Sequence, residues 1–241
     1  MTKKKIKYEM TLREKIEMVR MSIRAVTRKY KNSRLITGTP AIGKSKAVID
    51  ELEIENVKFK HILGGIKSAR TLFMTLTENN KKDLVLFFDD VNAILKKEEC
   101  RELLRVAVSN EKKRIITYRD SWLDKRKRKY PPELNFKSRI IIATNIPRKK
   151  IDPAITSRTS AIEILADKYE CIEYIKQNLK ASPPDNIPLK WKQEVYDYIT
   201  KEIEMDSVKQ MDFRIFEDCC LWRCAEMEPE LWKKLICTLI T

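Results

Sequence analysis

The chain reads Gly38-Thr39-Pro40-Ala41-Ile42-Gly43-Lys44-Ser45 over one continuous segment, which matches the pattern G-x-x-x-x-G-K-[ST]. Each fixed position of this pattern has a mechanical task. The glycines allow backbone N–H groups to close around phosphate oxygens. Lys44 supplies a positive charge to the β- and γ-phosphates, and the Ser45 hydroxyl can ligate Mg²⁺. The segment therefore predicts a binding site for a nucleotide.

The residues on either side of this loop support the same interpretation. Residues 35–37 are apolar and predict a short strand that enters the loop, and residues 45–50 have the composition of a helix that leaves it. The phosphates would then lie at a helix N-terminus, where unpaired N–H groups and the helix dipole favour anions. A turn that merely contains glycine is the alternative, but the order of strand, loop and helix favours nucleotide binding.

A second acidic motif follows at residues 84–90. Residues 84–88 are an apolar run of strand length that ends in Asp89-Asp90. Asp89 would hold Mg²⁺ directly or through water, and Asp90 is placed to polarise an attacking water. Alone, the pair also fits an ordinary turn at a strand end. Its place about forty residues after a phosphate-binding loop favours the Walker A and Walker B pair.

Apolar strands alternate with helical segments through the first two thirds of the chain. Strands are expected at 35–37, 57–63, 84–88, 114–118, 139–145 and 161–165, and helices at 11–30, 68–79 and 93–109. Fully apolar strands between helices predict a parallel sheet covered by helices on both faces. Beyond residue 166 only helices are expected, at 167–180, 189–204, 211–226 and 229–240. The fold class is α/β followed by a small helical domain, with domain boundaries expected at 1–34, 35–165 and 166–241.

The net charge of +15 is concentrated in two segments. Residues 1–34 hold 12 Lys and Arg against 3 acidic residues, and residues 112–150 hold 14 against 3, while the remainder holds 24 against 29. This distribution suggests a polyanion as partner, with a solvated basic surface as the alternative. The N-terminal cations proposed to contact DNA backbone are Lys3, Lys4, Lys5, Lys7, Lys15, Arg24 and Arg28.

Residues 121–135 are expected to form a polar, basic loop. Five consecutive cations in it are Lys125, Arg126, Lys127, Arg128 and Lys129. Trp122 and Tyr130 bracket these cations, which suits phosphate contacts combined with base stacking. A solvated loop and a nuclear-localisation signal are the alternatives.

The six cysteines are interpreted as buried thiols of a cytoplasmic protein. The chain has no C-x-x-C pair, and its only histidine, His61, is distant in sequence, so a zinc site or disulfides fit less well. No apolar run approaches the ~20 residues of a membrane helix. The basic start of the chain has no apolar segment behind it, so no secretory signal is expected.

With these motifs the chain resembles the AAA+ ATPase family over most of its length. Residues 140–147 look like the sensor 1 strand, which implies that Asn145 reads the γ-phosphate and orients water. Residues 152–158 are similar to the D-P-A-[IL]…R segment, which implies that Arg158 is an arginine finger reaching the nucleotide of a neighbouring subunit. Residues 211–214 look like sensor 2, which implies that Arg214 contacts the phosphates in cis. For Arg158 the alternatives are a solvated loop arginine or a local salt bridge, and for Arg214 the alternative is a structural role at the start of its helix.

More narrowly, the chain is similar to the short single-ring AAA+ ATPases of phages and mobile elements. That resemblance rests on residues 67–79 ahead of the Walker B strand and on residues 136–139 before sensor 1. It implies channel-facing loops at 63–67, where Ile66 and Lys67 would be displayed, and at 119–130. It further implies a homo-oligomer, as a hexameric ring or an open spiral, with ATP and Mg²⁺ as cofactors. DNA and a helicase or recombination protein are the expected partners.

One departure from the family pattern concerns Asp89-Asp90, where most active members have Asp-Glu. The shorter carboxylate would lie about 1.5 Å further from the water, which predicts slow hydrolysis unless the backbone compensates. The expected function is an oligomeric ATPase that acts on DNA in replication, recombination or helicase loading. A protein-remodelling ATPase and an ATP-gated assembly or switch remain as alternatives, and ATP over GTP rests on the resemblance alone.

Overall fold

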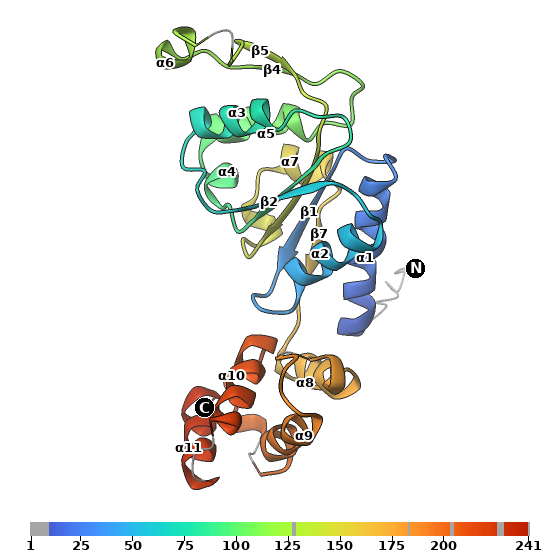
Figure 1. Ribbon diagram of the computed structural model, residues 1–241, viewed down its shortest axis with the longest axis vertical. Helices are drawn as coiled ribbons and strands as arrows, with labels where there is room; N and C mark the ends of the chain where they lie inside the picture. The colour runs from blue at the N-terminus through green and yellow to red at the C-terminus, as the bar shows by residue number, and fades with distance from the viewer. Residues whose placement is uncertain (1–9, 127–128, 183, 203–204, 226–228, 241) are drawn as a thin grey trace, which may run out of the picture. The chain divides into compact units, whose positions relative to one another are not determined.

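The computed structural model describes residues 10–126, 129–182, 184–202, 205–225 and 229–240 (Figure 1). The chain divides into two compact units, each with a hydrophobic core of its own. The sheet unit comprises Ile16–Gly38 and Lys44–Ile164. The C-terminal unit comprises Met1–Lys15, Thr39–Gly43 and Leu165–Thr241.

The sheet unit is built on five parallel strands in the order β2-β3-β6-β1-β7. The strands are β1 Ser33–Gly38, β2 Phe59–Leu63, β3 Val85–Asp89, β6 Arg139–Thr144 and β7 Ile162–Ile164. Every residue of β1, β3 and β6 is buried, which explains the consecutive apolar residues at 85–88 in β3 and at 140–143 in β6. The predicted parallel sheet with helices around it is therefore confirmed.

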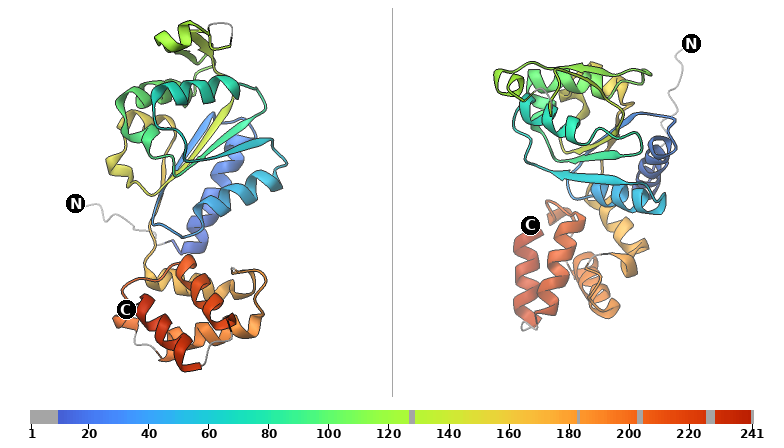
Figure 2. Two further views of the ribbon diagram at one scale, coloured as in Figure 1. Left: turned by 60° about the vertical axis from the view of Figure 1, so that its left-hand side comes forward. Right: turned by 45° about the horizontal axis from the view of Figure 1, so that its top comes forward.

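Helices cover both faces of this sheet. The helices of the sheet unit are α1 Leu12–Thr27, α2 Lys44–Ile54, α3 Ala69–Glu78, α4 Ala93–Lys96, α5 Glu98–Ala107 and α7 Pro153–Arg158, with a 3₁₀ turn at Arg148–Lys150. Leu86 and Phe88 of β3 belong to one core cluster with Phe73 of α3 and Leu104 of α5. Figures 1 and 2 show α1 and α2 on the opposite side of the sheet from α3, α4 and α5.

Two segments differ from the sequence-based expectation. The helix expected at 93–109 is two helices, because Lys97 between α4 and α5 has an extended backbone. The loop expected at 121–135 contains helix α6 Ser121–Asp124 and strand β5 Glu133–Asn135, which pairs with β4 Ile115–Thr117 in an antiparallel hairpin. Only the middle residue of each three-residue strand is buried, so the hairpin leaves little apolar signal in the sequence.

The C-terminal unit is helical throughout the residues that the structure describes. Its helices are α8 Lys168–Gln177, α9 Leu189–Asp197, α10 Phe213–Cys224 and α11 Pro229–Ile240, with shorter helical turns at Leu179–Ala181, Tyr198–Glu202 and Met205–Ser207. Its core contains Trp232, Phe216 and the adjacent thiols Cys219 and Cys220. Burial raises the pKa of the Cys220 thiol to about 12, so it stays protonated and unreactive at neutral pH. Among the described residues, no helix combines the length and the apolar character that crossing a membrane requires.

Three buried arginines stabilise helix ends in the sheet unit. The guanidinium of Arg139 donates to the last two carbonyls of α1, both at 2.7 Å. Arg114 donates to the last carbonyl of α5 at 2.6 Å, and Arg34 donates to Ser160 O, just beyond α7, at 2.7 Å. Arg139 and Arg114 thus meet the partial negative charge of carbonyls at helix C-termini, and Arg34 meets a carbonyl of the turn that follows α7. Burial lowers the pKa of Arg114 to about 10, which still leaves it charged at neutral pH.

A substitution at Gly38 tests how tightly β1 and β7 pack. Gly38 has a φ of 141°, and a Cβ there would lie 1.7 Å from Ile164 O. We expect Gly38→Ala to destabilise the protein by about 3 kcal/mol or more, because the two backbones would have to separate. Urea unfolding of the purified variant measures this loss.

The matched control is Gly64→Ala. Gly64 also has a positive φ, 58°, but nothing lies within 4 Å of the added Cβ. Gly64→Ala should therefore lose only about 1–2 kcal/mol of unfolding free energy, which comes from backbone strain. Equal losses of unfolding free energy in Gly38→Ala and Gly64→Ala would show that the close contact with Ile164 O is not what destabilises Gly38→Ala.

Candidate active site at the carboxyl edge of the sheet

Three neighbouring strands end together at one edge of the sheet. Parallel pairing places Asp89 of β3 beside Ala143 of β6, and Thr37 of β1 beside Thr144 of β6. The glycine-rich loop that begins at Gly38 continues from β1, Asp90 follows β3, and Asn145 follows β6. The parallel register therefore brings the three sequence motifs to one place.

Lys44 lies at the centre of this cluster. It is the first residue of α2, and only 7% of it is exposed. Its Nζ donates to Asn145 Oδ1 at 2.8 Å, across 101 positions of sequence, and to Gly38 O at 3.2 Å. The amine is thus held by neutral oxygens at the start of a helix, where an anion would be stabilised.

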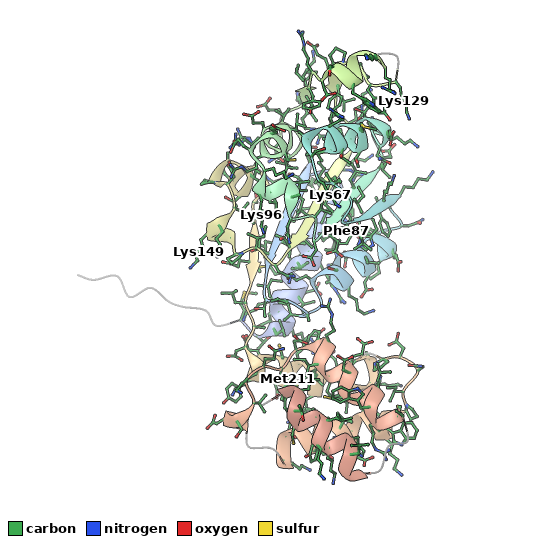
Figure 3. The ribbon with its side chains drawn as sticks, turned by 90° about the vertical axis from the view of Figure 1, so that its left-hand side faces the viewer. Lys67, Phe87, Lys96, Lys129, Lys149 and Met211 are labelled. Atoms are coloured by element: carbon green, nitrogen blue, oxygen red, sulfur yellow. The ribbon has the colours of Figure 1, made fainter. Side chains whose placement is uncertain are left out.

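Asp89 is held by two side chains from different elements. Ser45 Oγ donates to Asp89 Oδ1 at 2.7 Å, and His61 Nε2 lies 3.1 Å from Asp89 Oδ2. Because an ionised carboxylate only accepts, His61 is the donor in this contact. The His61 ring stacks on Phe87 with centroids 4.8 Å apart and an angle of 8°, which fixes its orientation (Figure 3 labels Phe87).

Sequence reasoning considered His61 only as a missing metal ligand. Its relation to Asp89 depends on the pairing of β2 with β3, which places His61 beside Phe87. The available signal was the chain's one histidine, in the strand next to the Walker B strand. That signal has meaning only when the strand order is known.

Asp90 has a left-handed backbone, with a φ of 51°. Its N–H donates to Ala143 O at 3.0 Å, and its carboxylate oxygens lie 3.4 and 3.5 Å from Asn145 Nδ2. Asp and Asn are the side chains that tolerate this conformation best after glycine. The backbone therefore gives a physical reason for aspartate rather than glutamate at this position.

The donor set at this edge fits Mg²⁺ bound together with a nucleotide. The Ser45 hydroxyl and the Asp89 carboxylate are hard oxygen ligands. Mg²⁺ is commonly held by one or two protein oxygens, with phosphate oxygens and water completing its shell. In the described part of the chain, no group of three or more His, Cys, Asp and Glu side chains gathers to hold a metal by itself.

The middle of the glycine-rich loop, Thr39–Gly43, belongs to the C-terminal unit. Thr39 Oγ1 donates to Ala166 O at 3.3 Å and accepts from Ala166 N at 3.1 Å. Phe213 N donates to Ala41 O at 3.1 Å. Ala41 and Gly43 have positive φ values of 52° and 82°, a backbone form that turns N–H groups toward a common centre.

A cavity of about 560 Å³ adjoins this part of the loop within the C-terminal unit. It is lined by Thr39 and Pro40 of the loop, by residues 166–169 around the start of α8, and by residues 209–212 ahead of α10. Its lining combines apolar and polar side chains, as pockets for small ligands commonly do. The pattern of the sequence did not indicate this cavity.

Both predicted arginines have exposed side chains. Arg158 ends α7, is exposed, and donates to Ala154 O of its own helix at 3.0 Å rather than joining the Lys44 cluster of the same chain. Arg214 is exposed in the first turn of α10, in the C-terminal unit. Their proposed roles at a nucleotide therefore stay predictions.

The predicted channel loop at 63–67 needs a correction. Ile66 is 4% exposed and packs in the main core cluster of the sheet unit, so it is not displayed. The glycines at 64 and 65 both have positive φ values and reverse the chain in a way that turns Ile66 inward. Leu63 and Lys67 are the exposed side chains of this segment (Figure 3 labels Lys67).

The basic segment before β6 needs a second correction. Tyr130 is 3% exposed and its hydroxyl donates to Glu78, so its ring cannot stack on a base. The Arg126 guanidinium lies 3.8 Å from the centroid of the Trp122 ring and covers one face of it. Lys125, Arg126 and Lys129 are exposed, whereas Lys127 and Arg128 lie outside the described residues.

Of the N-terminal cations proposed to contact DNA, each of the three that the structure describes pairs with a glutamate. Lys15 pairs with Glu170, Arg24 with Glu51, and Arg28 with Glu55. Lys3, Lys4, Lys5 and Lys7 lie outside the described residues. Lys15, Arg24 and Arg28 are therefore already paired within the protein, which weakens the hypothesis that they bind DNA backbone.

The strand order, the loop that follows β1 and the acidic end of β3 define a P-loop NTPase fold. The sequence model of the ATPase family associated with various cellular activities (AAA) matches residues 34–166, which is more than half of the chain. The chain belongs to this family, and membership indicates ATPase activity. The comparison with curated proteins gives no significant match.

His61→Ala tests the contact with Asp89. Without the imidazole donor, Asp89 loses one of its two side-chain partners and is free to rotate. Loss of such a supporting contact should raise the Mg²⁺ concentration needed for half-maximal ATP turnover by about tenfold. Turnover measured across a Mg²⁺ titration gives this value.

Lys60→Ala is the matched control, because Lys60 is the preceding residue of β2 and is exposed. Its Mg²⁺ dependence should equal that of the unaltered protein. An unchanged Mg²⁺ dependence in His61→Ala would remove His61 from the support of Asp89.

Proposed function

We propose that this protein is an oligomeric AAA+ ATPase that binds ATP with Mg²⁺ at subunit interfaces and acts on DNA. The observation that carries the ATPase part is the cluster in which Lys44 contacts Asn145, Asn145 approaches Asp90, and Ser45 contacts Asp89. Five groups of suitable chemistry converge there, from the ends of β3 and β6 and from the start of α2. Such convergence of a cation, a hydroxyl, an amide and two carboxylates is expected of phosphoryl transfer to water.

The residues that would hold the nucleotide are those of the loop, Gly38, Thr39, Pro40, Ala41, Ile42, Gly43, Lys44 and Ser45. In this proposal Lys44 exchanges the Asn145 amide oxygen for phosphate oxygens, which are stronger acceptors. Ser45 and Asp89 would hold Mg²⁺, which when bound neutralises phosphate charge. Asn145, released from Lys44, is then able to hydrogen-bond the terminal phosphate.

Asp90 acts in this proposal on the attacking water. Its exposed carboxylate accepts the water's hydrogen bond and then its proton. Arg158 of a neighbouring subunit supplies positive charge to the transferring phosphoryl group, and Arg214 does so within its own subunit. Arginine fingers contribute about 10³–10⁵ in rate in other phosphoryl-transfer systems.

The domain assignment that accompanies this function is also a proposal. Residues 35–165 would form the nucleotide-binding domain and residues 166–241 the helical lid. Residues 1–34 would form a basic N-terminal segment. A ring or open spiral of subunits, and a role in phage or mobile-element replication or recombination, rest on the narrower family resemblance.

The DNA part of the proposal is supported by exposed cations on the segment between β4 and β5. Lys125, Arg126 and Lys129 are exposed in this segment, which Figures 1 and 2 place at the outer end of the sheet unit. The Lys129 ammonium pairs with Glu78 but remains 67% exposed (Figure 3). Exposed cations on a projecting segment are suited to phosphate contacts that do not depend on sequence.

A second candidate function is an ATP-gated assembly with slow hydrolysis. It is favoured by the short Asp90 carboxylate and its left-handed backbone. Assembly that requires ATP, together with turnover that DNA does not stimulate, would select this function over the first.

Asp90→Asn tests the hydrolytic role. Asparagine tolerates the left-handed backbone, so the fold should be kept, but the amide cannot accept a proton. We expect ATP affinity to be unchanged and turnover to fall at least about 100-fold. Calorimetric binding and phosphate release measure the two quantities.

The control for binding is Lys44→Ala, which should lose ATP affinity as well as turnover. Turnover that persists at its normal rate in Asp90→Asn would exclude Asp90 as the group that activates water.

Replacing Lys125, Arg126 and Lys129 together with alanine tests the DNA contact. Three lost phosphate contacts should weaken DNA binding and reduce the slope of log affinity against log salt by about 2 to 3. Fluorescence anisotropy with labelled DNA at several salt concentrations measures both. The matched control removes three exposed charges from the C-terminal unit, Lys180, Lys190 and Lys234. If both variants bind with the same affinity and slope, the basic segment does not contact DNA.

A further inference from the structure

The helix that carries Arg158 is too short to hold its own position. α7 runs over six residues, Pro153–Arg158, and isolated helices of this length are unstable in water. Its placement must therefore come from contacts at its ends and along its buried side. Ile155, which is fully buried, provides the contact along that side.

The N-terminus of α7 is fixed by the two oxygens of Asp152, which have separate tasks. Oδ1 accepts from Ala154 N at 2.7 Å and from Ile155 N at 3.4 Å, so it caps the helix. Oδ2 accepts from Arg105 Nε at 3.2 Å, and a second bond comes from a terminal nitrogen of the same guanidinium. Capping and tethering are therefore carried by different atoms of one carboxylate.

Arg105 comes from the last turn of α5, and its position is itself fixed. A terminal nitrogen of its guanidinium also donates to Glu98 Oε1 at 3.0 Å, in the first turn of the same helix. The Asp152 side chain is 10% exposed and that of Arg105 is 32% exposed. The Arg105 guanidinium is the main cause that holds the pKa of the Asp152 carboxyl below its usual value, so the pair stays charged at neutral pH.

The other end of α7 is fixed by backbone contacts. Asn110 Nδ2 donates to Arg158 O at 3.1 Å, and Arg34 donates to Ser160 O two residues later. Arg158 is thus held through its main chain, while its side chain is exposed. This arrangement presents a guanidinium outward from a helix that is fixed at both ends.

We propose that Arg105 is a positioning residue that ties α7 to α5 through Asp152, so that Arg158 reaches the nucleotide of a neighbouring subunit in a fixed geometry. This inference rests on the proposed function, in which Arg158 acts in trans. The contribution of such a finger depends on its placement, because a displacement of about 1 Å at a reacting centre can cost about 100-fold in rate.

If Arg105 only stabilised the fold, its loss would lower the free energy of unfolding rather than the rate of ATP turnover. A partly exposed ion pair contributes little to folding, with a median of about 0–1 kcal/mol. The helix cap uses Oδ1 and does not need Arg105. Loss of Arg105 should therefore leave the chain folded and its own ATP site intact, while the finger helix loses its tether.

The test compares two arginines of the same helix. Arg105→Gln removes the tether, and the matched control Arg101→Gln removes an arginine that also binds Glu98, one turn earlier in α5. We expect turnover of the assembled protein to fall about tenfold or more in Arg105→Gln and to change by less than about twofold in Arg101→Gln. ATP affinity should be unchanged in both. Asp152→Asn, which keeps a capping oxygen but loses the charge, should behave like Arg105→Gln.

Mixing experiments separate this inference from the proposed function. Lys44→Ala has an inactive site but an intact finger, so mixing it with Arg158→Ala should restore turnover if fingers act in trans. Mixing it with Arg105→Gln should restore turnover in the same way, because the Lys44→Ala subunit then supplies a correctly held finger.

The outcomes are distinguishable. Recovery with both partners supports the inference. Recovery with Arg158→Ala but not with Arg105→Gln, or a loss of ATP affinity in Arg105→Gln, overturns the role of Arg105 and leaves the proposed function standing. No recovery with Arg158→Ala overturns the trans-acting finger, and the inference about Arg105 fails with it.

Discussion

Gly38 passes so close to the carbonyl oxygen of Ile164 that no side chain fits between β1 and β7. This contact determines where the chain leaves the sheet to form the glycine-rich loop. Because β1 pairs with β6, and β6 pairs with β3, the loop emerges beside the end of β6 and one strand away from the end of β3. The bonds of Lys44 to Asn145 and of Ser45 to Asp89 follow from that placement. The strand order and this one backbone contact therefore place the side chains of the site within hydrogen-bond distance of one another.

Charge is used inside this protein more than its composition indicates. A net charge of +15 pointed to a polyanion partner, yet three arginines are buried against main-chain carbonyls, and Lys15, Arg24 and Arg28 pair with glutamates. A buried cation at a helix end stabilises the fold and is lost to any external ligand. Net charge therefore overstates the cations available at the surface. The exposed cations between β4 and β5 are a better guide to what the protein binds.

The sequence predicted most where the signal is local. Strands β3 and β6 are apolar over consecutive residues, and the loop at 38–45 is one continuous motif, so both could be predicted from neighbouring residues alone. The hairpin of β4 and β5 was missed because each strand buries a single side chain. His61 was missed because its contact with Asp89 depends on which strands are neighbours. Tyr130 was assigned to base stacking from its place beside cations, but its packing against the core is a tertiary property that periodicity does not reveal.

The left-handed backbone at Asp90 has a consequence for how this site can change over evolutionary time. Such a position accepts aspartate and asparagine with similar ease, and the two differ by a single base in their codons. If Asp90 activates the attacking water as proposed, a subunit that hydrolyses its nucleotide and one that only holds it would differ by one substitution within the same fold. Glutamate would require the backbone to move as well. Under that proposal, selection at this position can tune the lifetime of a bound nucleotide without disturbing the architecture around it.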